Sequence, residues 1–180
     1  GNISAFIAQN PGTTPLVATI TVTPVYTAGG ASCPGTARTF TITVNPLPKV
    51  DVGADVVICQ DQVANLTAAL GGGATGGTWS GGAGTFSDKF SAITTYTPAT
   101  SEYGQTITLT FTSNDPAGPC PAVSDALLLT VNTLPIVSAG EDFAICKNTN
   151  LTISLLGATI TANGSGVTTG TWASSGTGVF

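Results

Sequence analysis

Histidine is absent from this chain, and charged side chains are scarce. Without histidine, no Ser-His-Asp or Cys-His arrangement can form within these residues, and zinc loses its usual nitrogen ligand. The nine acidic residues cluster only at Glu141-Asp142, so paired carboxylates for acid–base chemistry are not evident. The glycine run at 71–73 lacks the lysine and helix of a phosphate-binding loop. We therefore expect that the chain is not an enzyme.

Basic charge and long apolar runs are also missing. The chain has only four Lys and Arg residues, too few and too scattered for the basic stripe that nucleic-acid binding requires. Its longest apolar stretches, such as Ala126–Leu129, are far shorter than the ~18 residues of a membrane-spanning helix. We expect a chain with no nucleic-acid partner and no membrane insertion.

Threonine, serine, asparagine and glycine take the place of charge. Charged residues make up 7% of the chain, against about a quarter in a typical soluble domain. Few lysines, many threonines and four regularly spaced cysteines favour an oxidising, extracellular setting. We expect an extracellular protein.

An internal repeat organises the sequence. Five landmarks recur at a shared offset of 87 residues, which predicts tandem structural units. The matched pairs are 19–23 with 106–110, Cys33 with Cys120, 44–48 with 131–135, 53–55 with 140–142, and Cys59 with Cys146. The Gly-Thr-Trp of Trp79 returns at Trp172, 93 residues on, so about six extra residues fall in a loop at 158–169. The chain is predicted to hold the back half of one repeat (1–48), a complete repeat (49–134) and the front half of a third (135–180), as an internal piece of a longer protein.

Alternating apolar and hydroxylated residues predict β-strands and no helices. Ile107, Leu109 and Phe111, for example, alternate with threonines. Seven short strands in one repeat favour a two-sheet, immunoglobulin-like sandwich, with the tryptophans Trp79 and Trp172 in the core. The expected strands of the complete repeat are 50–58, 63–70, 76–80, 84–87, 92–97, 105–112 and 123–132. The fold class is thus all-β, in tandem repeats of about 87 residues.

Several stretches of this repeat resemble PKD-like and related immunoglobulin-like repeats, and more closely those of giant surface adhesins in gliding Bacteroidetes. The similar stretches are 52–59, 77–82, 96–98 and 114–120. The resemblance implies type IX export, a location on the cell surface in association with the outer membrane, a stalk of many domains, and a role in surface adhesion or gliding motility. The acidic turn that typical PKD domains carry after the tryptophan is replaced by Ser80-Gly81-Gly82, so the resemblance concerns the fold and not a PKD ligand.

Oxygen-rich turns raise the question of calcium. Asp55 and Asp142 share one repeat position, and Asp115 precedes a loop proline, so all three are candidate Ca²⁺ ligands. The competing interpretation is an Asx-type turn, in which the carboxylate bonds its own backbone. Because a calcium site needs about six oxygens, we expect turns at these positions and no cofactor.

Two disulfide patterns remain open. A bond within the complete repeat would join Cys59 to Cys120, closing about 60 residues for roughly 4 kcal/mol of stability. The alternative places each bond across the seam between neighbouring repeats, because the first turn and the last loop lie at opposite poles in an up-and-down strand order. In that pattern Cys59 pairs with the following repeat's cysteine before its last strand and Cys120 with the preceding repeat's first-turn cysteine, and neighbouring domains are locked into a rigid rod. The disulfide candidates are thus Cys33, Cys59, Cys120 and Cys146.

The leading functional hypothesis is a structural and adhesive stalk, whose partners are neighbouring repeats of the same chain. A polysaccharide or other surface ligand would bind through other regions. The alternative is a carbohydrate-binding accessory module of a secreted enzyme, which would expose tryptophans as stacking platforms for sugars.

Overall fold

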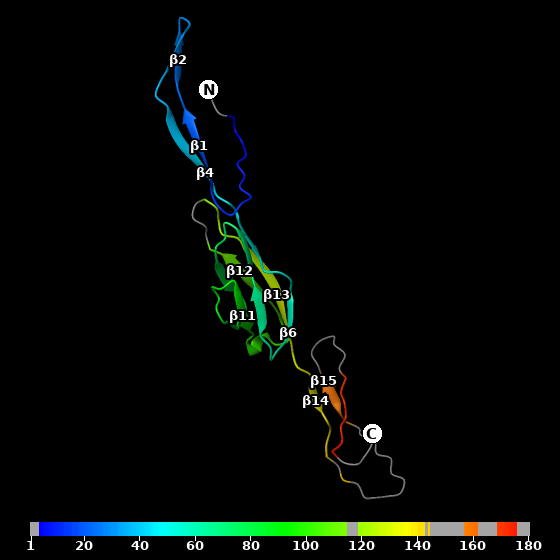
Figure 1. Ribbon diagram of the computed structural model, residues 1–180. Coiled ribbons are helices and arrows are strands. Elements are labelled where there is room, and N and C mark those ends of the chain that lie inside the picture. Colours follow the sequence, from blue (N-terminus) through cyan, green and yellow to red (C-terminus); the bar gives the residue numbers. More distant parts are fainter. Residues whose placement is uncertain (1–3, 115–118, 143, 145–156, 162–168, 176–180) are drawn as a thin grey trace.

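The computed structural model describes residues 4–114, 119–142, 144, 157–161 and 169–175. The described residues form strands and no α-helix, apart from the single 3₁₀ turn η1 (Thr100–Glu102). The all-β class predicted from the sequence is therefore confirmed. The chain is long and narrow, with an N-terminal hairpin, a central unit and a C-terminal strand pair arranged one after another (Figure 1). No described helix is long and apolar enough to cross a membrane.

The N-terminal part contains β1 (Leu16–Val22), β2 (Val25–Ala28), β3 (Ala31–Pro34) and β4 (Arg38–Val44). The central unit contains β5 (Pro48–Asp51), β6 (Val56–Cys59), β7 (Ala64–Thr67), β8 (Ala69–Gly72), β9 (Gly77–Ser80), β10 (Thr85–Phe86), β11 (Ile93–Thr97), β12 (Thr106–Ser113) and β13 (Ser124–Asn132). The C-terminal part contains β14 (Ile136–Ser138) and β15 (Thr159–Thr161).

The central unit is a sandwich of two layers. One sheet has the strand order β6-β13-β12-β9, the other has β10-β11-β7, and the pair β5-β8 extends the structure at the edge. The strands are antiparallel neighbours, with one exception: β6 runs parallel to β13. In an up-and-down order of seven strands the first and the last also run in the same direction, so this pair agrees with the order assumed from the sequence.

The core of the central unit follows from the period-2 alternation of its strands. On β12 and β13, the apolar residues Leu109, Phe111, Leu127 and Leu129 are at most 3% exposed, while the alternate residues, such as Thr108 of β12 and Leu128 of β13, are exposed. Trp79 on β9 is 1% exposed and meets Phe111 edge-on, with ring centroids 5.2 Å apart. Burial of this apolar face holds the two sheets together.

One predicted strand, 50–58, is in fact two. The chain leaves β5 at Asp51 and enters β6 at Val56, and these strands pair with different partners, β8 and β13. Gly53 has φ +78°, a conformation that favours glycine, and it lets the backbone turn between the sheets. The predicted strand 63–70 is likewise divided, because β7 pairs with β11 and β8 pairs with β5.

The N-terminal part is a long hairpin that the central unit does not cover. β1 pairs with β4, and β2 pairs with β3 around a turn at Gly29 and Gly30, both with positive φ. Phe40 on β4 lies opposite Ile20 on β1, as Leu127 lies opposite Leu109 in the central unit. The offset between Ile20 and Leu109 is 89 residues, so this strand is shifted by two relative to the repeat; a two-residue shift keeps the same side chains on the same face.

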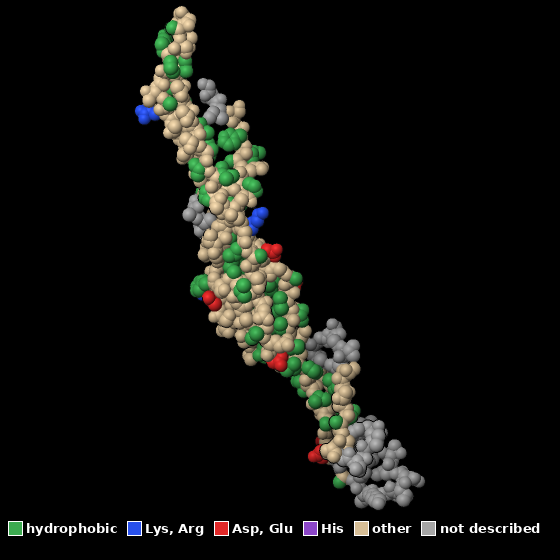
Figure 2. Space-filling model, in the orientation of Figure 1, with side chains coloured by type: hydrophobic (Ala, Val, Ile, Leu, Met, Phe, Trp, Pro, Cys, Tyr) green, Lys and Arg blue, Asp and Glu red, His purple; other side chains and the backbone are tan. Residues whose placement is uncertain are grey.

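Charge is thinly spread over the surface. The face shown in Figure 2 carries isolated Lys, Arg, Asp and Glu side chains, separated by wide uncharged areas. The hydroxyl groups of Thr106 and Thr130 bond to each other across β12 and β13, at 3.0 Å. Much of the polar surface is therefore hydroxylated and uncharged.

Candidate functional site

The junction between the N-terminal part and the central unit is tightly packed. Pro46 and Pro48 are buried, and Leu47 between them is 65% exposed. The N–H of Gly73 donates to the carbonyl of Leu47 at 3.2 Å. A Cβ atom on Gly73 would lie 2.7 Å from the carbonyl oxygen of Pro46, so only glycine allows this close approach. The connection is thus held against the end of β8.

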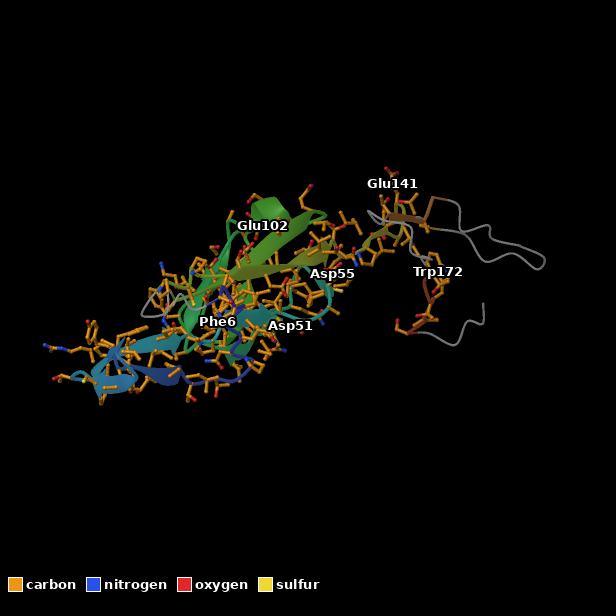
Figure 3. The ribbon with its side chains drawn as sticks, turned by 90° about the horizontal axis from the view of Figure 1, so that it is seen from above. Phe6, Asp51, Asp55, Glu102, Glu141 and Trp172 are labelled. Carbon is orange, nitrogen blue, oxygen red and sulfur yellow. The ribbon has the colours of Figure 1, made fainter. Side chains whose placement is uncertain are left out.

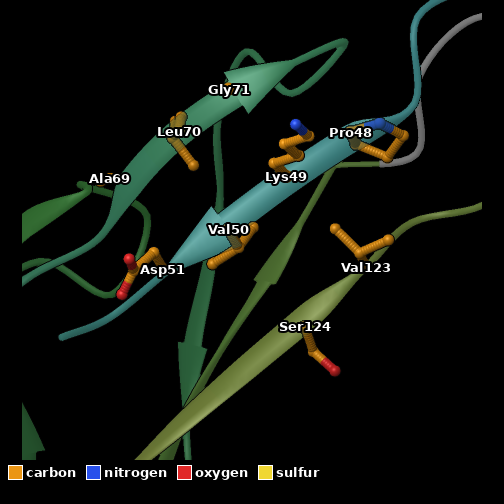
Figure 4. Close-up of a pocket in the computed structure, with 9 residues that line it drawn as sticks. All are labelled: Pro48, Lys49, Val50, Asp51, Ala69, Leu70, Gly71, Val123 and Ser124. Carbon is orange, nitrogen blue, oxygen red and sulfur yellow. The ribbon is translucent and has the colours of Figure 1, made fainter. Parts of the chain in front are cut away.

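A shallow apolar pocket lies next to this junction. Its lining includes Val50 on β5, Leu70 on β8, and Val123 just before β13 (Figure 4). Lys49 and Asp51 are the only charged side chains among its lining residues. The pocket offers no set of groups for catalysis, and its place at the sheet edge marks where the first junction meets the central unit.

The second junction is more open. Pro135, the counterpart of Pro48 in the repeat, is exposed, and so is Leu134. It is still tied to the central unit, because the N–H of Gln60 donates to the carbonyl of Asn132 at 2.8 Å. The two junctions therefore differ in packing although their sequences are similar.

A buried polar cluster connects Tyr96 on β11 with Glu102 in η1. The carboxylate of Glu102, 4% exposed, accepts the hydroxyl of Tyr96 at 2.8 Å and the backbone N–H groups of Ala83 and Ala99 at 2.6 and 2.8 Å. The Tyr96 hydroxyl also accepts the N–H of Gly84 at 2.7 Å. Figure 3 shows Glu102 within the central unit, well away from Trp172.

Burial and hydrogen bonding perturb both groups of this cluster. Burial would raise the pKa of Glu102, but the N–H donors of Ala83 and Ala99 and the Tyr96 hydroxyl outweigh it and hold that pKa below its ordinary value of 4.5. Burial, together with the bond to Glu102, raises the pKa of Tyr96 to about 12. Every polar atom of the pair is engaged by the protein itself, so we interpret the cluster as an internal anchor for the loop at 81–84.

Composition and strand patterns did not lead us to this cluster. Tyr96 belongs to a stretch that resembles other repeats, but nothing in the sequence singles out Glu102, and buried glutamates are rare. The signal available in the sequence was the glycine pair Gly81-Gly82. A Cβ atom on Gly82 would collide with the Tyr96 hydroxyl. Glycine at this position therefore indicates that a side chain packs directly against the backbone.

The structure does not group the described calcium candidates, Asp55 and Asp142, with other ligands. Asp55 accepts the N–H of Leu128 at 2.9 Å, a bond to a distant strand and not to its own turn. The Asx-type turn is made instead by Asp51, which accepts the N–H of Gly53 at 2.9 Å. Asp142 is exposed, and Asp115 lies outside the described residues. Within the described part of the chain, no three His, Cys, Asp or Glu residues are grouped for a metal ion.

Cys59 and Cys120 lie toward opposite ends of the central unit. Cys33, Cys59 and Cys120 are not disulfide-bonded, and Cys146 lies outside the described residues. Cys59 is opposite Asn132 at the end of β13, whereas Cys120 precedes the start of β13 at Ser124. The nine residues of β13 span roughly 26 Å at the rise of a strand, and bonded cysteines need Cα atoms within about 7 Å. This geometry excludes a Cys59–Cys120 bond in the folded unit.

The two tryptophans have different surroundings. Trp79 is buried, and its indole N–H donates to the carbonyl of Ser91 at 3.1 Å. Trp172 is 54% exposed, so the expected core position is wrong for this residue. The reason is that Trp79 is covered by Phe111 on β12, and the described residues after β14 supply no such strand for Trp172.

No family model, curated protein or solved structure matches this chain.

Proposed function

We propose that this chain is a stretch of tandem immunoglobulin-like β-sandwich repeats, of about 87 residues each, that forms a structural and adhesive stalk on a cell surface. The units are 1–48, 49–134 and 135–180. The chain performs no catalysis and holds no cofactor. Its role is to hold neighbouring units in line and to project a binding region away from the cell.

The packed junction at 46–48 carries this proposal. A flexible tether between domains would be exposed and free of contacts. Here Pro46 and Pro48 are buried and Gly73 closes on the backbone between them, so bending at this point requires breaking packing. Stiff connections between units are what a stalk requires.

Two further features support a stalk. The uncharged, hydroxylated surface allows solubility without attracting charged partners, in keeping with a spacer. The resemblance of stretches such as 52–59 and 77–82 to gliding adhesins supports type IX export, an extracellular location and a part in attachment or gliding. These cellular roles rest on the resemblance.

Small-angle X-ray scattering on the dilute chain tests the stalk. We expect the distance distribution of a rod, unchanged between low and high salt because few charges are involved. The Gly73→Ala variant should shift that distribution toward bent forms, since its Cβ would meet the Pro46 carbonyl. Gly71→Ala is the matched control, because its Cβ would lie 3.6 Å from the Lys49 side chain, an ordinary contact. A compact wild-type particle, or equal bending in both variants, would contradict the proposal.

One observation favours the alternative, a carbohydrate-binding module: the indole of Trp172 is exposed. It borders a cavity of about 400 Å³ whose lining includes Val137 and Ile160. A glycan array probed with the whole chain tests this function. Specific binding that is lost in a folded Trp172→Ala variant would favour the module over the stalk; no binding above background would remove it.

A further inference from the structure

Phe90 is the exception among the aromatic residues of the central unit. Its side chain is 66% exposed, and Ile93, three residues further on at the start of β11, is 72% exposed. Two exposed apolar side chains so close in sequence, on an otherwise polar surface, favour a contact site over chance exposure. The other aromatic side chains of this unit lie in the core or pack against it: Trp79, Phe86, Tyr96, Tyr103 and Phe111.

The loop that carries Phe90, residues 88–91, is held in place by hydrogen bonds. Trp79 donates its backbone N–H to the carbonyl of Lys89 at 2.8 Å and its indole N–H to the carbonyl of Ser91 at 3.1 Å. The carboxylate of Asp88 accepts the N–H of Phe90 at 2.8 Å. The backbone on both sides of Phe90 is therefore fixed before a partner binds, which lowers the conformational entropy lost on binding.

The same apolar positions occur a second time in the sequence. The stretch 90–93 (Phe-Ser-Ala-Ile) has a counterpart 87 residues earlier, at 3–6 (Ile-Ser-Ala-Phe). The two positions that are exposed in the central unit are apolar in both stretches. We infer that the role of this apolar pair recurs with the repeat.

A groove opens on the other side of the central unit, between two sheet edges. β7 is the last strand of one sheet and β6 the last strand of the other, whereas the Phe90 loop bonds to β9, at the opposite end. The chain turns at Gly53, with φ +78°, and leaves the outer edge of β7 without a neighbouring strand among the described residues. The cavity between the edges has a volume of about 400 Å³, a size typical of pockets that take ring-shaped groups. Its apolar lining includes Val52, Val56, Leu66 and Leu127.

Charge is complementary between the loop and the groove. The ammonium of Lys89 lies 5.1 Å from the centre of the Phe90 ring, so the loop presents a cation beside its apolar side chain. Asp51 is the one charged residue among those that line the groove, and Asp55 directly follows the lining residue Ala54. Two loops facing each other would bring like cations together, and two grooves would bring like carboxylates together. The loop therefore fits the groove better than either surface fits its own copy.

We propose that the Phe90 loop of one copy of this chain inserts into the groove between β6 and β7 of a second copy. Phe90 enters the apolar cavity, and Lys89 lies against Asp51. Because the two surfaces differ and lie on opposite sides of the central unit, the contact is heterologous, and copies associate side by side in open rows. The proposal goes beyond the stalk function and does not rest on it, since the scattering of dilute monomers tests the stalk separately.

Analytical ultracentrifugation of the whole chain tests the contact, with reductant present so that thiol cross-links cannot contribute. We expect the average mass to rise with concentration above the 17.8 kDa monomer. Phe90→Asp should weaken association by about 30-fold or more, the effect of losing a central aromatic anchor, and Phe90→Ala should weaken it without adding a charge. Tyr26→Asp is the matched control, because Tyr26 is 72% exposed but lies on β2, outside the central unit. A monomeric wild type, or a Phe90→Asp variant that associates no more weakly than Tyr26→Asp, would overturn the proposal.

A mixing experiment tests the groove side of the contact. Ala54 is an exposed lining residue, so Ala54→Arg places a long cation in the groove, where it repels Lys89, and leaves the loop intact. Ala54→Arg and Phe90→Asp should each remain monomeric alone, and an equal mixture should form a dimer of one copy of each that grows no further. A mixture that stays monomeric, or an Ala54→Arg variant that associates like the wild type, would refute the proposed contact. Circular dichroism of each variant checks that the central unit is still folded, as we expect for changes at exposed positions.

Discussion

The phenol of Tyr96 is expected to set the alkaline limit of stability of the central unit. Its pKa is raised from 10.0 to about 12 in the folded chain, because burial and the bond to Glu102 oppose its ionisation. The unfolded chain releases this proton near pH 10 and the folded chain retains it. The stabilisation is therefore complete below pH 10 and is lost as the pH rises toward 12.

The size of this effect follows from the shift. A pKa raised by about two units corresponds to about 2–3 kcal/mol in the free energy of unfolding. The Tyr96→Phe variant cannot ionise here, so its free energy of unfolding should fall less steeply between pH 10 and 11.5. At neutral pH the variant should already be about 2–4 kcal/mol less stable, because the N–H of Gly84 and the carboxylate of Glu102 lose a buried partner.

Urea denaturation at a series of pH values measures both effects. Tyr103→Phe removes another tyrosine hydroxyl and serves as the control, with the alkaline dependence of the wild type retained. Ultraviolet absorbance of the phenolate gives an independent titration of the folded protein. Parallel pH curves for the wild type and Tyr96→Phe would refute the reasoning, whatever their difference at neutral pH.

Three further predictions follow from the same unit. Glu102→Gln should cost about 2–4 kcal/mol at pH 7, since an amide nitrogen would face a backbone donor. Because the pKa of Glu102 is lowered, its contribution is present above pH 4.5 and lost as the pH falls further, so the variant's stability should vary less with pH below 4.5. Trp79→Ala should cost about 3–5 kcal/mol in urea denaturation and leave the Ser91 carbonyl unpaired; a loss under 1 kcal/mol would argue against the core position. Peptide mapping of the oxidised folded chain should yield no Cys59–Cys120 peptide, and recovering one would contradict the parallel arrangement of β6 and β13.

The strands were predictable where a single sheet face is buried. In β12 apolar residues alternate with threonine over the whole strand, and in β13 every second residue from Leu127 to Val131 is buried; the predicted bounds of both strands differ from the observed ones by one residue. The break between β5 and β6 was missed, because apolar residues continue through 50–58 on both sides of the change of sheet. Only Gly53 marks that break, and glycine in a strand has several uses.

The candidate site was less predictable than the fold. The seam prolines were recognisable, but their burial depends on Gly72 and Gly73, which are distant in sequence from Pro46 and whose run carries no motif. The parallel pairing of β6 with β13 could not be derived either. Without this pairing, both a Cys59–Cys120 bond within the repeat and bonds across the seam remained open.

The parallel pair β6 and β13 has a mechanical consequence. The chain enters the central unit through β5, just before β6, and leaves it at the end of β13. Tension applied to the two ends pulls β6 and β13 past each other in opposite directions along their length. All the hydrogen bonds of this ladder, which runs from Leu129 opposite Val56 to Asn132 opposite Cys59, then bear the force together. They cannot break one after another. Resistance to pulling is set by the barrier to unfolding rather than by equilibrium stability, so this short ladder would contribute to that barrier together with the β5–β8 pair that precedes it along the chain.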